Sequence, residues 1–346
     1  MSTAVAVVLL LAVVTYAVFG GADFGAGFWD LTAGGAERGA RPRSLIEHSI
    51  GPVWEANHVW LIFIFVVTWT AFPEAYASIT LTLFVPLTIA ALGIVLRGAS
   101  FAFRKTVVGV PARRVFGGAF ALSSVLVPYC MGTVAGGIAS GRVPAGGKAG
   151  DPVASWVNPT SIVTGVLAVV LAAYLAAVYL VWDARRIDDD LVDFFRRRAV
   201  ATAVVAAVIV VVGVFVLRAD ARYVFDGLTS RALPLMILSV ACGAGALLLL
   251  VRDASRGARV AAAGAVAGVI GGWGVAQWPY LLPESLTLSA AAAPSGTLSA
   301  LVVAVVMAVV IVLPGFALLY VLDQKHLLPE EGVEDAGDRP LDQPAG

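Results

Sequence analysis

Nine apolar runs, each long enough to cross a lipid bilayer as a helix, constrain this 346-residue chain more than any other feature. A helix rises about 1.5 Å per residue, so about 20 mostly apolar residues span ~30 Å of hydrocarbon. Only 13% of the residues are charged and the mean hydropathy is +0.91, which excludes an ordinary soluble domain. The expected spans are Ala4–Ala26, Val53–Phe72, Tyr76–Leu96, Val115–Ile138, Val157–Trp182, Val200–Leu217, Leu233–Val251, Val260–Leu281 and Leu298–Leu322.

The Lys and Arg residues concentrate in alternate connections between these runs. Of the 23 basic residues, 18 lie in odd-numbered connections or in the C-terminal tail. Because cytoplasmic loops accumulate positive charge, we expect the N-terminus outside and the C-terminus in the cytoplasm. The chain should form an all-α integral membrane protein, with one transmembrane domain over residues 1–325 and a polar, disordered cytoplasmic tail over 326–346.

Composition also limits the function classes. The formal net charge is +0, so no basic field exists that would hold nucleic acid. The two cysteines give no disulfide framework and no paired-cysteine metal site. The three histidines, His48, His58 and His326, cannot supply two axial ligands deep in one helix bundle. We therefore expect neither a metal nor a haem to be bound by this chain alone.

Asp23 is the first candidate for chemistry inside the membrane. It lies near the end of the first apolar run, flanked by the small residues of the segment G-G-A-D-F-G-A-G, residues 20–27. An ionisable side chain in hydrocarbon costs a few kcal/mol and often marks a proton pathway. The position also fits a helix-end acid that reaches the headgroups, and the sequence alone leaves both interpretations open.

A second candidate group opens the second run with an unusually polar helix start. Glu55 and His58 stand at positions i and i+3, so they share one helix face, and Asn57 lies close by. A carboxylate and an imidazole placed in this way could exchange a proton. The alternative is that Glu55 only complements the helix dipole while Trp54 and Trp60 anchor the helix at the membrane interface.

Arg97 ends the third run on the same side of the membrane as these acids. It fits a cytoplasmic anchor. It could also pair with Asp23 or with Glu55, which we state as a hypothesis.

Two motifs carry a resemblance to a known family. The segment around Asp23 and the string I-G-P-V-W-E-A-N-H-V-W-L-I, residues 50–62, resemble subunit II of the cytochrome bd-type quinol oxidases. The corresponding family segments read roughly G-F-D-x-G-x-G and I-G-P-x-W-D-G-N-x-V-W-L-I. The resemblance covers about residues 1–325, with further matches at Ala71–Pro73, Leu96–Arg97, Asn158–Pro159 and Gly274–Pro283.

The resemblance implies a fold of nine helices, arranged as two four-helix bundles and one peripheral helix. It implies a heterodimer in the bacterial cytoplasmic membrane, in which subunit I binds haem b and haem d and oxidises quinol, while subunit II carries no haem. Asp23 and Glu55 then match acids of a cytoplasmic proton route toward the oxygen-reducing haem, and Asn57 and Arg97 match neighbouring motif positions. Membrane lipids, quinone and a small accessory subunit are further expected partners.

The chain departs from the family pattern at one of these motifs. Glu55-Ala56-Asn57 stands where the family usually has Asp-Gly-Asn, and His58 replaces a position that is usually Gln or Glu. An acid remains, one methylene longer, which indicates a divergent branch. Two other functions stay open: a proton-coupled secondary transporter, and a purely structural subunit needed for assembly.

The substitution Glu55→Gln tests the proton role of the second motif. We expect it to slow quinol-dependent O2 consumption while leaving the haem spectrum of the complex unchanged, because the amide keeps the shape of the side chain but carries no proton. Normal turnover in an intact complex would remove Glu55 from the pathway.

Overall fold

The computed structural model describes residues 1–35, 38–50, 54–106 and 110–324. The side chains of Trp54 and Glu55 and the predicted tail, 326–346, lie outside what it describes. The described chain is almost wholly helical, with one small antiparallel hairpin. Its elements are α1 Ser2–Leu31, α2 Ala40–Ile50, α3 Trp54–Ala71, α4 Pro73–Thr82, α5 Phe84–Thr106, α6 Val110–Ala139, α7 Pro159–Ala184, α8 Asp189–Asp220, α9 Arg222–Thr229, α10 Leu233–Val251, α11 Ser255–Gln277, β1 Tyr280–Leu282, β2 Leu286–Thr287, α12 Leu288–Ala291 and α13 Ser295–Gln324.

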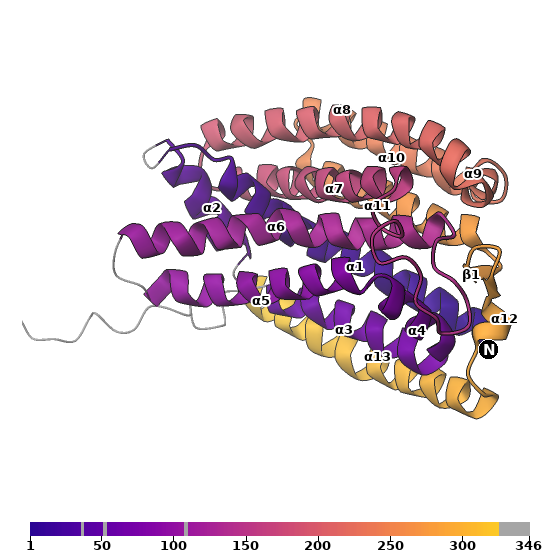
Figure 1. Ribbon diagram of the computed structural model, residues 1–346. Coiled ribbons are helices and arrows are strands. Elements are labelled where there is room, and N and C mark those ends of the chain that lie inside the picture. Colours follow the sequence, from indigo (N-terminus) through magenta and orange to yellow (C-terminus); the bar gives the residue numbers. More distant parts are fainter. Residues whose placement is uncertain (36–37, 51–53, 107–109, 325–346) are drawn as a thin grey trace, which may run out of the picture. The chain divides into compact units, whose positions relative to one another are not determined.

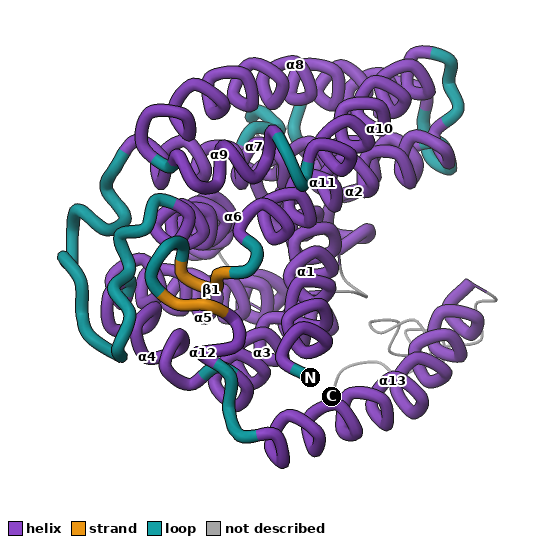
Figure 2. Tube along the Cα trace, turned by 90° about the vertical axis from the view of Figure 1, so that its right-hand side faces the viewer, coloured by secondary structure: helices purple, strands orange, loops and turns teal. Residues whose placement is uncertain are grey.

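The chain divides into two compact units, Met1–Leu298 and Ser299–Gly346. In the first unit α1 lies between other helices and packs against α3, α6, α7 and α11 (Figure 1). Helices that follow one another also pair, α5 with α6, α7 with α8, and α10 with α11. The largest core cluster follows α7, and the hairpin and α12 lie at the end of the first unit that faces the viewer in Figure 2. The second unit contains the rest of α13.

The lengths and compositions of the helices agree with a multi-pass membrane protein. Seven helices in the described residues are long and apolar enough to cross a bilayer, and one further pair, α4 and α5, would qualify as a single bent span. The apolar part of α3, Asn57–Ala71, is shorter than a usual span. The number of spans, nine, and their orientation in the membrane therefore stay predictions.

The expected span Tyr76–Leu96 is not one unbroken helix. α4 ends at Thr82, α5 begins at Phe84, and the two helices meet at an angle of 85°. Pro86 explains the break, because its ring would clash with the carbonyl of Thr82 in a continuous helix, whereas the first turn of a new helix needs no N–H at that position.

The connection between the first two expected spans contains a helix of its own, because residues 40–50 form α2. Leu45 and Ile46 of this helix are buried against the main core cluster, and burying them stabilises the helix. His48 consequently lies in the last turn of a helix and not in a loop.

The eighth expected span, Val260–Leu281, also ends early. α11 stops at Gln277, and Leu281 belongs to strand β1. Pro279 accounts for this end, because the residue before a proline is disfavoured in the helical conformation.

The connections are tied together by ion pairs at two ends of the first unit. Arg41 of α2 pairs with Asp188 before α8, and Arg185 after α7 pairs with Asp253 after α10. At the other end, Arg142 pairs with Asp220 at 2.6 Å. Arg-rich connections predicted to share the cytoplasmic side are thus in contact with one another.

The loop at residues 146–150 is hydrogen-bonded along α4. Three side chains spaced one helical turn apart, Glu74, Ser78 and Thr82, accept hydrogen bonds from the backbone N–H groups of Gly146, Gly147 and Gly150, at 2.7, 3.1 and 2.9 Å. The broken helix therefore has a structural use: α4 provides hydrogen-bond acceptors for a loop whose backbone would otherwise lack partners.

Close contact between α1 and α7 depends on Gly25. A Cβ atom at Gly25 would lie 1.9 Å from the carbonyl oxygen of Ala172, so only glycine fits. Gly21, four residues earlier, is less crowded, because a Cβ atom there would meet Leu175 at 3.7 Å, an ordinary contact. Small residues allow helix backbones to approach closely in lipid.

The substitution Gly25→Ala should destabilise the protein by about 1–3 kcal/mol, because α1 and α7 must move apart. The matched variant Gly21→Ala should be neutral or stabilising by up to about 1 kcal/mol, because alanine has the higher helix propensity. Thermal denaturation of both variants, purified in detergent from their own membranes, measures the difference. Equal stability of the two variants would contradict the close contact.

Candidate functional site

A buried ion pair links α1 to α5. Nη2 of Arg97 lies 2.7 Å from Oδ1 of Asp23 and donates a second hydrogen bond, of 2.9 Å, to the main-chain oxygen of Asp23. The exposed fractions of the two residues are 1% and 6%. The hypothesised pairing of Arg97 with Asp23 is therefore present. Asp23 does not reach the headgroups as a helix-end acid, because α1 continues to Leu31 and the carboxylate is enclosed.

Two residues of α6 complete the surroundings of the guanidinium. Nη1 of Arg97 donates a hydrogen bond to Oγ of Ser124, which donates in turn to the carbonyl of Phe120 at 2.6 Å. The Arg97 Cζ atom lies 4.2 Å from the ring centroid of Phe120 and 5.0 Å from that of Phe24 on α1. Aromatic faces attract a desolvated cation, so these rings replace part of the lost hydration.

The glycine-rich segment of α1 makes room for this pair. A Cβ atom at Gly27 would lie 2.0 Å from Oγ of Ser124 and 2.8 Å from Nη1 of Arg97. The space that a larger side chain would fill is therefore occupied by the guanidinium and its hydroxyl partner. The unusual density of glycines around Asp23 thus has a direct steric cause.

One oxygen of the Asp23 carboxylate has no hydrogen-bond partner in the described residues, and we call it the open oxygen. Oδ1 accepts from Arg97, whereas Oδ2 is buried and has no hydrogen-bond partner within the described residues. Buried polar atoms in proteins are nearly always hydrogen-bonded, to protein or to ordered water. A carboxylate held on one oxygen and open on the other can bind a proton at Oδ2 without losing its contact with Arg97.

The second motif lies beside this pair on α3. The ring of His58 meets the ring of Phe24 edge to face, with centroids 6.0 Å apart, and Nδ2 of Asn57 donates to the carbonyl of Phe19 on α1 at 3.4 Å. Trp60 is half-buried and meets Phe63 at 6.4 Å. The structure thus brings Asn57 and His58 to α1. Trp54 and Glu55 lie in the first turn of α3, where the structure describes their backbone but not their side chains.

Sequence reasoning missed Ser124, Phe120 and a second buried acid, Asp30. Asp30 is 6% exposed, and its Oδ1 lies 3.4 Å from Nε of Arg43. The signals were a pair of serines at 123–124 inside an apolar run, and an acid seven residues after Asp23, which is two helical turns and therefore the same face of α1.

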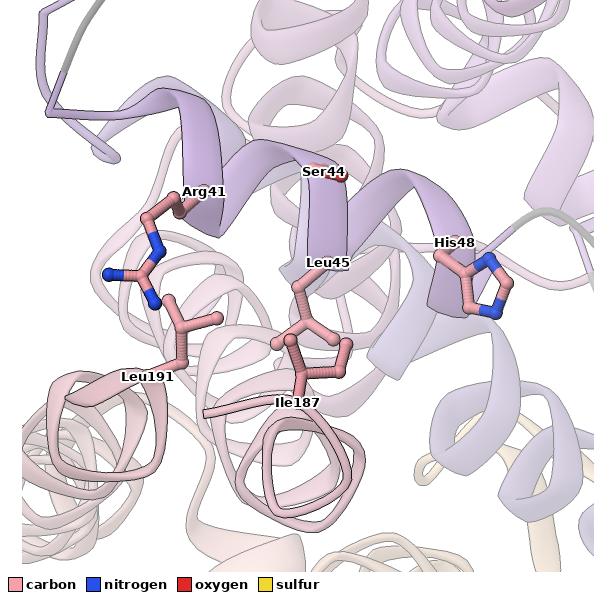
Figure 3. A pocket seen from close by; sticks show the side chains of 6 residues that line it. All are labelled: Arg41, Ser44, Leu45, His48, Ile187 and Leu191. Carbon is pink, nitrogen blue, oxygen red and sulfur yellow. The ribbon is translucent and has the colours of Figure 1, made fainter. Parts of the chain in front are cut away.

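A cavity of about 330 Å³ lies between α2 and the start of α8 (Figure 3). Its lining mixes polar side chains of α2 with aliphatic ones, and Leu45 faces Ile187 in the close-up. None of the predicted site residues lines it. Its lining residues are Arg41, Ser44, Leu45, His48, Ile187 and Leu191. In the described residues no group of three or more His, Cys, Asp or Glu side chains could hold a metal ion.

Comparison with known proteins identifies the family. The family model described as cytochrome bd terminal oxidase subunit II matches residues 1–323. The chain belongs to this family. A relative, the cytochrome bd ubiquinol oxidase subunit 2 of Bacillus subtilis (strain 168), is 28% identical over 226 residues. That match covers 64% of each chain, less than two thirds of the relative's length.

Two further likenesses extend over nearly the whole subunit. The putative cytochrome bd menaquinol oxidase subunit II of Bacillus subtilis (strain 168) is 21% identical over 331 residues, which cover 91% of this chain and 94% of the relative. A solved chain of the bd oxidase from Geobacillus thermodenitrificans has a TM-score of 0.79 at 24% identity, with 93% of this subunit and 98% of that chain covered. The structural likeness shows a shared fold.

Removing the arginine should be far more harmful than removing both charges. Arg97→Met leaves the Asp23 carboxylate buried without a counter-ion, at a cost of about 3–5 kcal/mol, and we expect little folded subunit II in the membrane. The double variant Asp23→Leu with Arg97→Met should recover most of the folded protein. Membrane yield and thermal stability measure both. A single variant as stable as the wild type would contradict a buried pair.

Proposed function

We propose that this chain is the haem-free subunit of a cytochrome bd-type terminal oxidase in a bacterial cytoplasmic membrane. Its partner would be subunit I, which binds haem b and haem d, and the complex would oxidise quinol and reduce O2 to water. The chain's own task would be to draw protons from the cytoplasm toward the site of O2 reduction. Family membership supports the assembly, and the buried Asp23 supports the proton task.

The observation that carries this proposal is the open oxygen of a buried acid. Buried ionisable residues inside a membrane are costly, and they mark ion or proton pathways more often than structural sites. Arg97 orients the carboxylate through Oδ1, and Oδ2 is left to bind and release a proton. Replacing such a pair by apolar residues often leaves stability unchanged or improved, so stability alone gives no reason to keep it.

In this proposal the second motif forms the route by which protons reach Asp23. Glu55 would take protons from the cytoplasm as the main relay acid at the start of α3. His58, beside the Phe24 ring, would be an additional carrier specific to this branch. Asn57 ties α3 to α1 through Phe19 and keeps the two helices in register. Trp54 and Trp60 would anchor α3 at the membrane interface.

The transporter hypothesis has one observation in its favour. Transporters place their substrates at broken helices, and the pair α4 and α5 is broken at Leu83. However, α4 uses its polar side chains to bind the loop at 146–150, and the cavity in Figure 3 is formed by α2 and α8. The candidate proton carriers lie on α1 and α3. The oxidase subunit is therefore the better supported function.

Purification from native membranes tests the assembly. We expect reduced-minus-oxidised spectra with haem b and haem d bands, and a larger membrane subunit that co-purifies with this chain. A colourless single chain from membranes that contain intact oxidase would contradict the proposal and favour a transporter.

The substitution Asp23→Asn tests the proton task. It keeps a hydrogen-bond acceptor for Arg97 but carries no proton, so we expect quinol-dependent O2 consumption per assembled, haem-containing complex to fall by roughly tenfold or more, even where the lost charge lowers the yield of complex. Asp220→Asn is the matched control, because Asp220 also pairs with an arginine, Arg142, at the other end of the first unit. Its complex should keep normal turnover. Equal turnover of the two assembled variants would favour a purely structural subunit.

A further inference from the structure

One face of α1 carries a repeating pattern that extends beyond Asp23. Tyr16, Gly20, Asp23, Gly27 and Asp30 follow one another at spacings of four and three residues, which places them in a single line along the helix. Hydroxyl or carboxyl side chains alternate with glycines in this line. All three polar members are buried, with exposed fractions of 9%, 6% and 6% for Tyr16, Asp23 and Asp30.

The hydroxyl of Tyr16 is a second buried polar atom without a hydrogen-bond partner in the described structure. Its ring belongs to a hydrophobic cluster with Leu61, Val127 and Cys130. Two open polar atoms, the Tyr16 hydroxyl and Oδ2 of Asp23, therefore lie in the same line of one helix.

The direction of the Tyr16 side chain is set by Gly20. A Cβ atom at Gly20 would lie 2.9 Å from Cε2, 3.0 Å from Cδ2 and 3.5 Å from Cζ of Tyr16. The ring thus lies against Gly20, the residue between Tyr16 and Asp23 in this line. The Cα atoms of Tyr16 and Asp23 are about 10 Å apart along the axis, and the two side chains fill part of that distance. The absence of a side chain at Gly20 makes this orientation possible.

We propose that ordered water joins the Tyr16 hydroxyl to Oδ2 of Asp23, and that Tyr16 is a positioning residue for the proton-carrying oxygen. The inference deepens the function proposed above and rests on it only for the role of Asp23 in turnover. Water satisfies buried polar groups that the protein leaves open, provided that polar partners surround it. Here the hydroxyl and the carboxylate oxygen are those partners. Tyr16 then keeps Oδ2 hydrated inside the protein.

Infrared spectroscopy of the purified oxidase complex tests the water link. The Asp23 carboxyl band is assigned as the band that Asp23→Asn removes. We expect Tyr16→Phe, which deletes only the hydroxyl, to shift this band. Tyr174→Phe is the matched control, because Tyr174 on α7 also has a buried hydroxyl without a partner in the described residues. It should leave the band in place.

A second pair of variants tests the ring orientation without changing the tyrosine. Gly20→Ala should push the ring away from its position over the helix and shift the Asp23 band in the same way as Tyr16→Phe. Gly21→Ala, whose added methyl group meets only ordinary contacts, should not. The haem spectrum of each complex shows whether the variant has assembled.

The outcomes separate this inference from the proposed function. An unshifted Asp23 band in assembled Tyr16→Phe and Gly20→Ala complexes would overturn the water link, even if Asp23→Asn slows turnover. Normal turnover of Asp23→Asn would instead overturn the proton task, while a shifted band would still establish the link. We expect both the shifted band and a loss of turnover in Tyr16→Phe that is smaller than the loss in Asp23→Asn.

Discussion

A buried guanidinium has no water to bind, so Arg97 must find its hydrogen-bond partners within the protein. It finds a carboxylate and a main-chain oxygen on α1, a hydroxyl on α6, and the faces of two aromatic rings. Because these groups belong to α1 and α6 while Arg97 belongs to α5, one guanidinium links three helices, α1, α5 and α6. The glycines of α1 follow from this arrangement, since Gly27 makes room for the guanidinium and Gly25 allows α7 to approach.

The same interaction connects stability with function. A buried ion pair is a weak source of stability compared with apolar packing, but removing one partner is costly. Such a pair tends to persist where the charge itself is needed. In this subunit the arginine holds one oxygen of Asp23 and leaves the other open, so the packing that holds the helices together also orients a group able to exchange a proton. The nearby α3 adds Asn57 and His58 to the surface of α1.

Several features could be predicted from the sequence because they depend on local chemistry. Asn158 and Pro159 open α7 as expected, with the Asn158 side chain accepting from the backbone N–H of Ser161. The partner of Arg97 was one of two acids on the same side of the membrane, and the structure places Asp23 against it. Other features could not be predicted. The break at Leu83 and the helix α2 inside an expected loop depend on which apolar side chains find a buried surface, and this is a property of the assembled helices.

The sequence by itself determined that this chain is a helical membrane protein of the bd oxidase subunit II family, because length, hydropathy and motif are properties of the linear chain. It also picked out Asp23 and Glu55 as candidate site acids, since an ionisable residue in an apolar run is conspicuous. Only the tertiary structure decided that Asp23 is enclosed, that Ser124 accepts a hydrogen bond from its partner Arg97, and that the second carboxylate oxygen of Asp23 has no hydrogen-bond partner in the described residues. These features depend on contacts between residues that are distant in the sequence. Helical periodicity predicts the helix face on which a residue lies, but not which residue of another helix it contacts.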